Sequence, residues 1–99
     1  MEVRFADDRL QRLESDPSFR AKEFGDDVVR SFRKKLQFIR AAVDERDLYQ
    51  MKSLHFEKLK GDRAHQRSVR LNKQWRLILE LAEEAGGKVV VVVSVEDYH

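Results

Sequence analysis

The sequence predicts an α+β domain in which helices cover one face of an antiparallel sheet. Three observations lead to this fold class. Between residues 26 and 43, apolar side chains recur every three or four positions, which is the period of a helix face. Between residues 68 and 81 they alternate, which is the period of a strand. Residues 89–95 are all valine except Ser94, as expected for a strand buried inside a sheet.

The first elements along the chain are a short strand and a short helix. Residues 2–5 can form an opening strand, after which Asp7 or Asp8 can accept hydrogen bonds from the first turn of a helix. This helix ends before Pro17, because proline lacks the amide hydrogen and pushes the preceding residue into an extended conformation.

A second, longer helix is predicted from residue 26 to residue 43. Its apolar side chains are four, four, three and four positions apart, so they lie on one face. They are Val28, Phe32, Leu36, Ile39 and Val43. The acidic pair at its start favours the positive end of the helix dipole.

Strand periodicity dominates the second half. In residues 75–81, Trp75 and alternate leucines lie on one face, and Arg76 lies on the other. Residues 72–74 and 82–88 are predicted turns. Residues 54–62 can add a strand if it starts late or contains a bulge. We therefore expect one domain over residues 1–99, with two N-terminal helices on an antiparallel sheet of three to four strands.

Composition excludes several classes of site. The chain has no cysteine, which excludes disulfides and thiolate metal sites. Its three histidines are far apart, its glycines form no phosphate-binding loop, and no apolar run approaches the roughly 20 residues of a membrane span. We expect no metal, no other cofactor and no membrane association, in a reducing compartment such as the cytoplasm.

Positive charge is concentrated in the middle of the chain. Residues 52–76 hold eight Lys or Arg residues against two acids, a net charge of +6, whereas the whole chain carries only +2. The eight include Lys58, Lys60, Lys73, Arg63, Arg70 and Arg76. Such a block attracts phosphates and favours nucleic acid as a partner, although a solvated sheet face is an equally simple explanation.

The last three residues are Asp97, Tyr98 and His99, which can all move protons. Adjacent antiparallel strands could bring them close to cations of the basic block, namely Lys60, Arg63, Arg70 and Arg76. Such a set can cleave RNA without a metal, because cations stabilise the phosphorane while an acid and a base move the protons. The alternative is that Tyr98 packs on the core and its neighbours have no role.

Two sequence markers resemble the HigB branch of the RelE/ParE toxin superfamily. They are "LKGDR" followed about a dozen residues later by "NKQWR", and the closing "DYH"; the resemblance spans nearly the whole chain. It implies a RelE-like fold with two N-terminal helices over a curved antiparallel sheet. It also implies a toxin of a type II toxin–antitoxin module, which enters the ribosomal A site and cuts translated mRNA without a metal.

The resemblance also implies partners and site residues. The partners would be the ribosome, mRNA and a HigA-like helix-turn-helix antitoxin, with operator DNA reached only through the antitoxin. By motif position, Lys60 and Arg76 would neutralise the transition state, and Asp97, Tyr98 and His99 would be catalytic, with His99 the leading acid–base group. Arg70 would support them. Arg63, Lys58 and Lys73 would bind RNA phosphates.

The sequence departs from the family at Glu57. Some HigB toxins carry a catalytic histidine three residues before the motif lysine, where this chain has Glu57, and His55 does not align with it. Glu57 could replace that histidine as general base, or it could form an ion pair with Lys58 or Arg63.

Two other functions remain open from the sequence. A ParE-like toxin would share the fold but inhibit DNA gyrase by binding, without catalysis. A module that has lost catalysis would only bind RNA or the antitoxin. The terminal "DYH" and the cations favour the nuclease.

Overall fold

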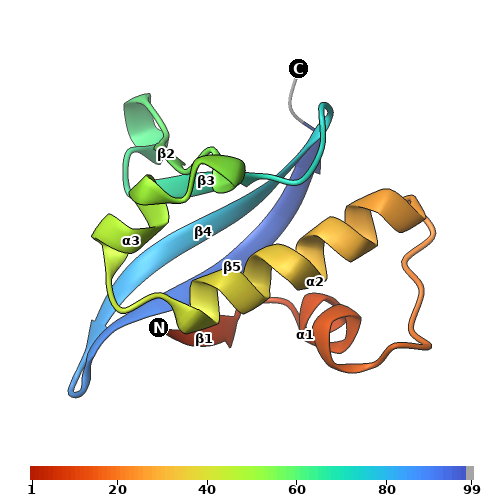
Figure 1. Ribbon diagram of the computed structural model, residues 1–99, viewed down its shortest axis with the longest axis horizontal. Helices are drawn as coiled ribbons and strands as arrows, with labels where there is room; N and C mark the ends of the chain where they lie inside the picture. The colour runs from red at the N-terminus through yellow and green to blue at the C-terminus, as the bar shows by residue number, and fades with distance from the viewer. Residues whose placement is uncertain (98–99) are drawn as a thin grey trace.

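A computed structural model describes residues 1–97, in which helices lie on one face of a five-stranded sheet (Figure 1). The helices are α1 (Asp8–Ser15), α2 (Asp26–Ala41) and α3 (Glu45–Gln50), with short 3-10 helices η1 (Lys52–Leu54) and η2 (Gly61–Arg63). The strands are β1 (Glu2–Phe5), β2 (Glu57–Lys58), β3 (Gln66–Arg70), β4 (Trp75–Glu84) and β5 (Gly87–Asp97). Tyr98 and His99 lie outside the described residues.

The sheet is mixed, in the order β1-β5-β4-β3-β2. Four of its strands pair antiparallel, as the sequence predicts, but β1 pairs parallel with β5, opposite Val89–Val92. The prediction of an all-antiparallel sheet with three to four strands is therefore wrong in this respect. A parallel neighbour needs a long crossover, and here the entire helical layer and three strands lie between β1 and β5 in the sequence.

The first two helices begin where the sequence predicts. The Asp7 side chain accepts a hydrogen bond from the Arg9 amide at 2.8 Å and caps α1. Helix α1 ends at Ser15, and Asp16 is extended, as expected for the residue before Pro17. Helix α2 lies across the sheet and buries Phe32, with other apolar side chains of its predicted face, against it (Figure 1).

The predicted end of α2 is wrong at Val43. The helix ends at Ala41, and Ala42 has an extended backbone with ψ 145°, which turns the chain away. Val43 is consequently 84% exposed rather than buried. Val43 would lie on the apolar face of α2 only if the helix continued for another half turn.

Helix α3 was not expected from the sequence. It has six residues, and only Leu48 among them is buried, so it offers no periodic pattern to detect. Its start is fixed locally, because the Asp44 side chain accepts hydrogen bonds from the amides of Arg46 and Asp47.

The alternation predicted for β4 is confirmed. Leu77 and Leu79 are fully buried in the core beneath the helices, together with Val69 of β3, whereas Arg76 and Ile78 lie on the opposite face. Strand β5 has a bulge opposite Ile78 and Leu79, where the pairing skips Val93. Strand β2 is only two residues long, in agreement with the expected late strand start.

Asn72 connects the β3–β4 turn to the helical layer. Its side-chain oxygen accepts hydrogen bonds from the amides of Gln74 and Trp75, at 2.9 and 2.7 Å. Its side-chain amide donates to the Asp27 carboxylate at 2.9 Å, and this bond lowers the pKa of Asp27. The turn that leads into Arg76 is therefore tied to the beginning of α2.

Phe32 provides a test of the helix–sheet interface. We expect Phe32→Ala to lower the free energy of unfolding by about 3–5 kcal/mol, because it leaves a cavity between α2 and the sheet. Urea denaturation measures this loss. Gln37→Ala on the exposed side of α2 is the control, with an expected change within about 0.5 kcal/mol. Equal effects of the two substitutions would contradict the assigned interface.

Candidate active site

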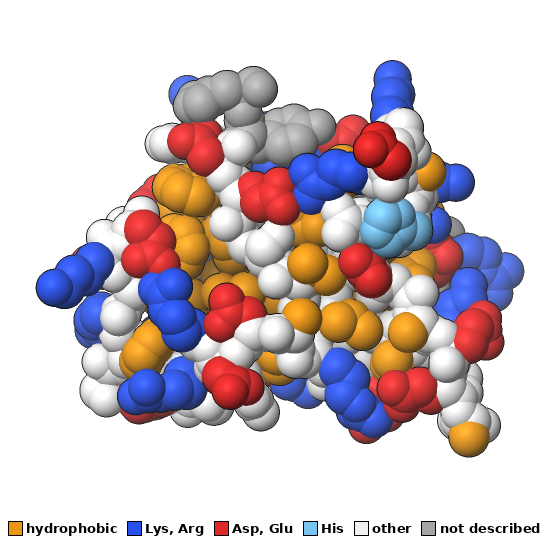
Figure 2. Space-filling model, turned by 180° about the vertical axis from the view of Figure 1, so that it is seen from behind, with side chains coloured by type: hydrophobic (Ala, Val, Ile, Leu, Met, Phe, Trp, Pro, Cys, Tyr) orange, Lys and Arg blue, Asp and Glu red, His pale blue; other side chains and the backbone are white. Residues whose placement is uncertain are grey.

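The face of the sheet away from α2 carries two transverse rows of side chains, of which all but Ile78 are polar. One row contains Glu57, Ser68, Ile78 and Ser94 on four neighbouring strands. The next row contains Arg70, Arg76 and Glu96. Figure 2 shows this side of the molecule, where acidic and basic side chains lie among hydrophobic ones. We call this surface the open face.

Arg76 is the most deeply placed cation of the open face. It is 8% exposed, and its position on β4 puts it between β3 and β5. Its Nη2 atom donates to the Oε1 atom of Glu57 at 2.5 Å, to the hydroxyl of Ser68 at 2.9 Å and to the His55 carbonyl at 3.3 Å. These three bonds hold the Nη2 end of the guanidinium in place.

Glu57 is held beside Arg76 by the segment before it. His55 adopts a left-handed backbone with φ 45°, which turns the chain out of η1 and into β2. Glu57 then pairs with Ser68 in the β2–β3 register and projects over the open face. Its side chain is 56% exposed, so a ligand can reach the carboxylate from solvent. The ion pair expected with Lys58 or Arg63 is therefore formed with Arg76 instead.

Arg63 forms a second ion pair, with Glu96. Two parallel bonds of 2.9 Å join the guanidinium to both carboxylate oxygens, and Arg63 also donates to Gln66 at 2.8 Å. Since Glu96 lies opposite Arg76 in the register, this pair connects η2 to the end of β5 beside the Arg76 site. The hydrogen bonds from Arg63, supported by Ser94, lower the pKa of Glu96.

The other predicted cations lie at different distances from this centre. Arg70 is half-buried and pairs directly with Arg76 in the β3–β4 register, so it belongs to the open face. Lys60 is exposed at the start of η2, next to β2. Lys58 alternates with Glu57 and pairs with Arg67, which turns toward α3. Lys73 is exposed in the β3–β4 turn.

Asp97 lies on a different face from Arg76. It pairs with Trp75 in the β4–β5 register, and Trp75 packs against the helical core. Its carboxylate accepts a hydrogen bond from the Gln74 side chain at 3.0 Å. The strand register therefore separates Asp97 from Arg76, although the sequence groups them as candidate site residues. The predicted roles of Tyr98 and His99 fall outside the described residues.

Two open-face residues were missed in the sequence. Ser68 is 0% exposed and hydrogen-bonds to Arg76, and Glu96 holds Arg63. Ser68 could have been found as a hydroxyl two residues before Arg70, which places both side chains on the same face of an alternating strand. Glu96 could have been found by the same alternation, since it lies two residues after Ser94 on β5 and opposite Arg76. Within residues 1–97, no group of three or more His, Cys, Asp or Glu side chains is placed to hold a metal ion.

The match to a family model identifies the chain. Residues 3–99 match the model described as "RelE-like toxin of type II toxin-antitoxin system HigB". The chain belongs to the HigB-like toxin family. A search among curated proteins gave no match. None of the helices in the described part of this HigB-like toxin is long and apolar enough to cross a membrane.

Solved toxin structures share the fold of this HigB-like toxin. YafQ from Escherichia coli aligns with a TM-score of 0.63 at 10% identity, over 97% of this chain and 91% of that one. The YoeB–YefM complex from Staphylococcus aureus gives 0.59 at 17%, over 100% and 97%. A YoeB/ParE toxin from Agrobacterium tumefaciens gives 0.57 at 16%, over the whole of both chains. At these identities the likeness concerns the fold, and it confirms the predicted RelE-like class.

The Arg63–Glu96 pair predicts a pH-dependent contribution to stability. Because the pKa of folded Glu96 is lowered, the pair stabilises the protein above the ordinary glutamate pKa, and the contribution is lost as the pH falls through the lowered value. Both side chains are partly exposed, so we expect Glu96→Gln to cost only about 0.2–1 kcal/mol at pH 7.

Denaturation of both proteins across a pH series measures this difference. It should shrink toward zero on acidification, while Glu83→Gln at the exposed far end of β4 should show no comparable trend. A difference between wild type and Glu96→Gln that stays constant down to low pH would contradict the pairing.

Proposed function

We propose that this HigB-like toxin is an endoribonuclease that cuts translated mRNA in the ribosomal A site, without a metal or other cofactor. The observation that carries the proposal is the nearly buried Arg76 guanidinium, fixed next to the exposed Glu57 carboxylate on the open face. A rigid cation beside a carboxylate can stabilise a charged phosphorane and move a proton at the same place.

Arg76 would bind the scissile phosphate. Its planar fork matches two phosphate oxygens, and the incoming phosphate would take the position that the Glu57 carboxylate now occupies on Nη2. Arg70, its direct neighbour across the strands, adds a second positive charge to the same row. Lys60 at the start of η2 would reach the phosphate from the exposed side. Lys58, Lys73 and Arg63 would contact the flanking backbone.

Proton transfer would use Glu57 and His99. Displaced from Arg76, the Glu57 carboxylate takes the proton of the 2′-OH, and the 2′-oxygen attacks phosphorus. The bond to the 5′-oxygen breaks, and that oxygen receives a proton from His99, which leaves a 2′,3′-cyclic phosphate and a 5′-OH. Asp97 would orient His99, and Tyr98 would stack on a base.

The proposal includes an antitoxin partner. The family is described as part of a type II toxin–antitoxin system, and YoeB, which shares the fold, is known in a complex with YefM. For this chain we propose a HigA-like helix-turn-helix antitoxin, which would also mediate any contact with operator DNA. Ribosome and mRNA would be met in the cytoplasm.

Induced expression tests the activity. We expect growth arrest and new 5′ ends within translated codons, detected by primer extension on a message with and without its start codon. Arg76→Ala should reduce cleavage about 10²–10³-fold, because it removes a preorganised phosphate donor. Arg46→Ala, at an exposed arginine of α3, is the control and should cut like the wild type. Intact mRNA together with altered DNA supercoiling would favour the ParE-like alternative.

Two substitutions separate the proton-transfer roles. In single-turnover cleavage, Glu57→Gln and His99→Ala should each lower the rate about 10²–10⁴-fold, because each removes one of the two proposed proton-transfer groups. Glu57→Gln should bind RNA at least as tightly as the wild type, because a competitor for Arg76 is neutralised. Full cleavage by Glu57→Gln would mean that Glu57 serves only as the ion-pair partner of Arg76.

A further inference from the structure

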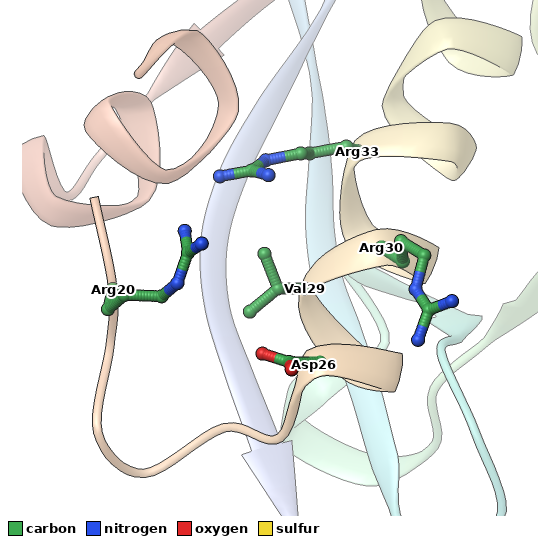
Figure 3. Close-up of a pocket in the computed structure, with 5 residues that line it drawn as sticks. All are labelled: Arg20, Asp26, Val29, Arg30 and Arg33. Atoms are coloured by element: carbon green, nitrogen blue, oxygen red, sulfur yellow. The ribbon is translucent and has the colours of Figure 1, made fainter. Parts of the chain in front are cut away.

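A second cationic site lies on the helical side of the molecule. A hollow of about 220 Å³ is lined by Arg20, Asp26, Val29, Arg30 and Arg33. Figure 3 shows Arg20 and Arg33 reaching toward each other from the loop before α2 and from α2 itself, with Val29 and Asp26 between them and Arg30 at the side. None of these residues belongs to the open face.

Two guanidinium groups of this hollow are positioned by carbonyl groups. Arg33 donates to the Leu13 carbonyl at 2.8 Å and to the Asp16 carbonyl at 3.2 Å. Arg20 donates to the carbonyls of Pro17 and Phe19 at 2.7 and 3.2 Å. Carbonyl groups orient a guanidinium without neutralising its charge, so the hollow keeps its positive potential.

The lack of carboxylate partners distinguishes these arginines from most others. Within residues 1–97, no carboxylate oxygen lies within 4.0 Å of the guanidinium of Arg20, Arg30 or Arg33. Seven other arginines do have such a partner: Arg4, Arg9, Arg40, Arg46, Arg63, Arg67 and Arg76. Two positioned arginines, Arg20 and Arg33, therefore reach toward the hollow with Arg30 at its side, and among the described residues none of the three is in an ion pair.

We propose that this hollow binds a carboxylate side chain of a protein partner, and that in the proposed module the partner is the antitoxin. Two facing guanidinium forks match the geometry of one carboxylate. The Asp26 carboxylate at the same hollow disfavours a polyanion with evenly spaced charges, but it can accept hydrogen bonds from the amides of a polypeptide. Val29 offers an apolar floor for the methylene groups of a Glu or Asp side chain.

Binding of the antitoxin to variants of the full chain tests the site. We expect Arg20→Gln combined with Arg30→Gln to weaken antitoxin binding at least about tenfold in calorimetric titration, since two of the three positive charges that line the hollow are lost. Arg46→Gln is the matched control and should change the affinity less than about twofold. Thermal unfolding checks that the double variant is folded. If it is not, the affinity of Arg30→Gln alone is measured, and we expect it to fall by a smaller factor.

Two further probes distinguish protein from RNA and separate this site from the proposed nuclease activity. A peptide with one glutamate should shift the side-chain NMR signals of Arg20 and Arg33, whereas its glutamine counterpart should not. An oligouridylate should bind wild type and double variant equally. The proposal is overturned if the antitoxin binds both proteins equally, if the glutamate peptide leaves the signals unchanged, or if only oligouridylate affinity falls.

The peptide arm does not depend on RNA cleavage. If the glutamate peptide shifts the NMR signals of Arg20 and Arg33 but the protein does not cut mRNA, the carboxylate site is supported and the nuclease activity is rejected. Normal cleavage with no peptide shifts and unchanged antitoxin affinity would reject the site and retain the nuclease.

Discussion

The charge on Arg76 is held inside a sheet, where water cannot solvate it well, and the structure around it keeps it hydrogen-bonded. Burying a guanidinium without hydrogen-bond partners would destabilise the fold by several kcal/mol, so the residues around it are restricted in type and position. Ser68 must be small and polar, Glu57 must project from a strand of two residues, and the His55 carbonyl must turn inward. The short β2 strand and the left-handed His55 bring two of these partners, the Glu57 carboxylate and the His55 carbonyl, to Arg76.

Much of the fold could be predicted because its signals are local. The period of α2, the alternation in β4, the capping Asp7 and the break at Pro17 each act within a few residues. The parallel pairing of β1 with β5 could not be predicted, since it depends on contact between the two ends of the sequence. Helix α3 was missed because one buried leucine gives no period.

The candidate site could likewise be predicted only in part. Arg76 and Arg70 were found because motif and alternation agree on their direction. The partner of Glu57 was mistaken, because the sequence brings Lys58 and Arg63 near it, whereas the β2–β3–β4 register brings Arg76. Asp97 was grouped with the cations by its proximity to the end of β5, but one residue of register places it on the Trp75 side. Registers between strands decide such contacts, and a single sequence specifies them weakly.

The position of β5 has a consequence for how the toxin acquires its shape. Among the described strands it comes last in the chain, yet it lies between β1 and β4 and separates the first strand from the rest of the sheet. A nascent chain that has not yet emerged beyond residue 86 has no strand with which β1 can pair, and it lacks the core residues Val90 and Val92. Closure of the sheet is thus postponed until β5 has been synthesised, because the contacts between β1 and β5 have a large sequence separation. A product that ended at residue 86 would lack β5, and with it the open-face residues Ser94 and Glu96.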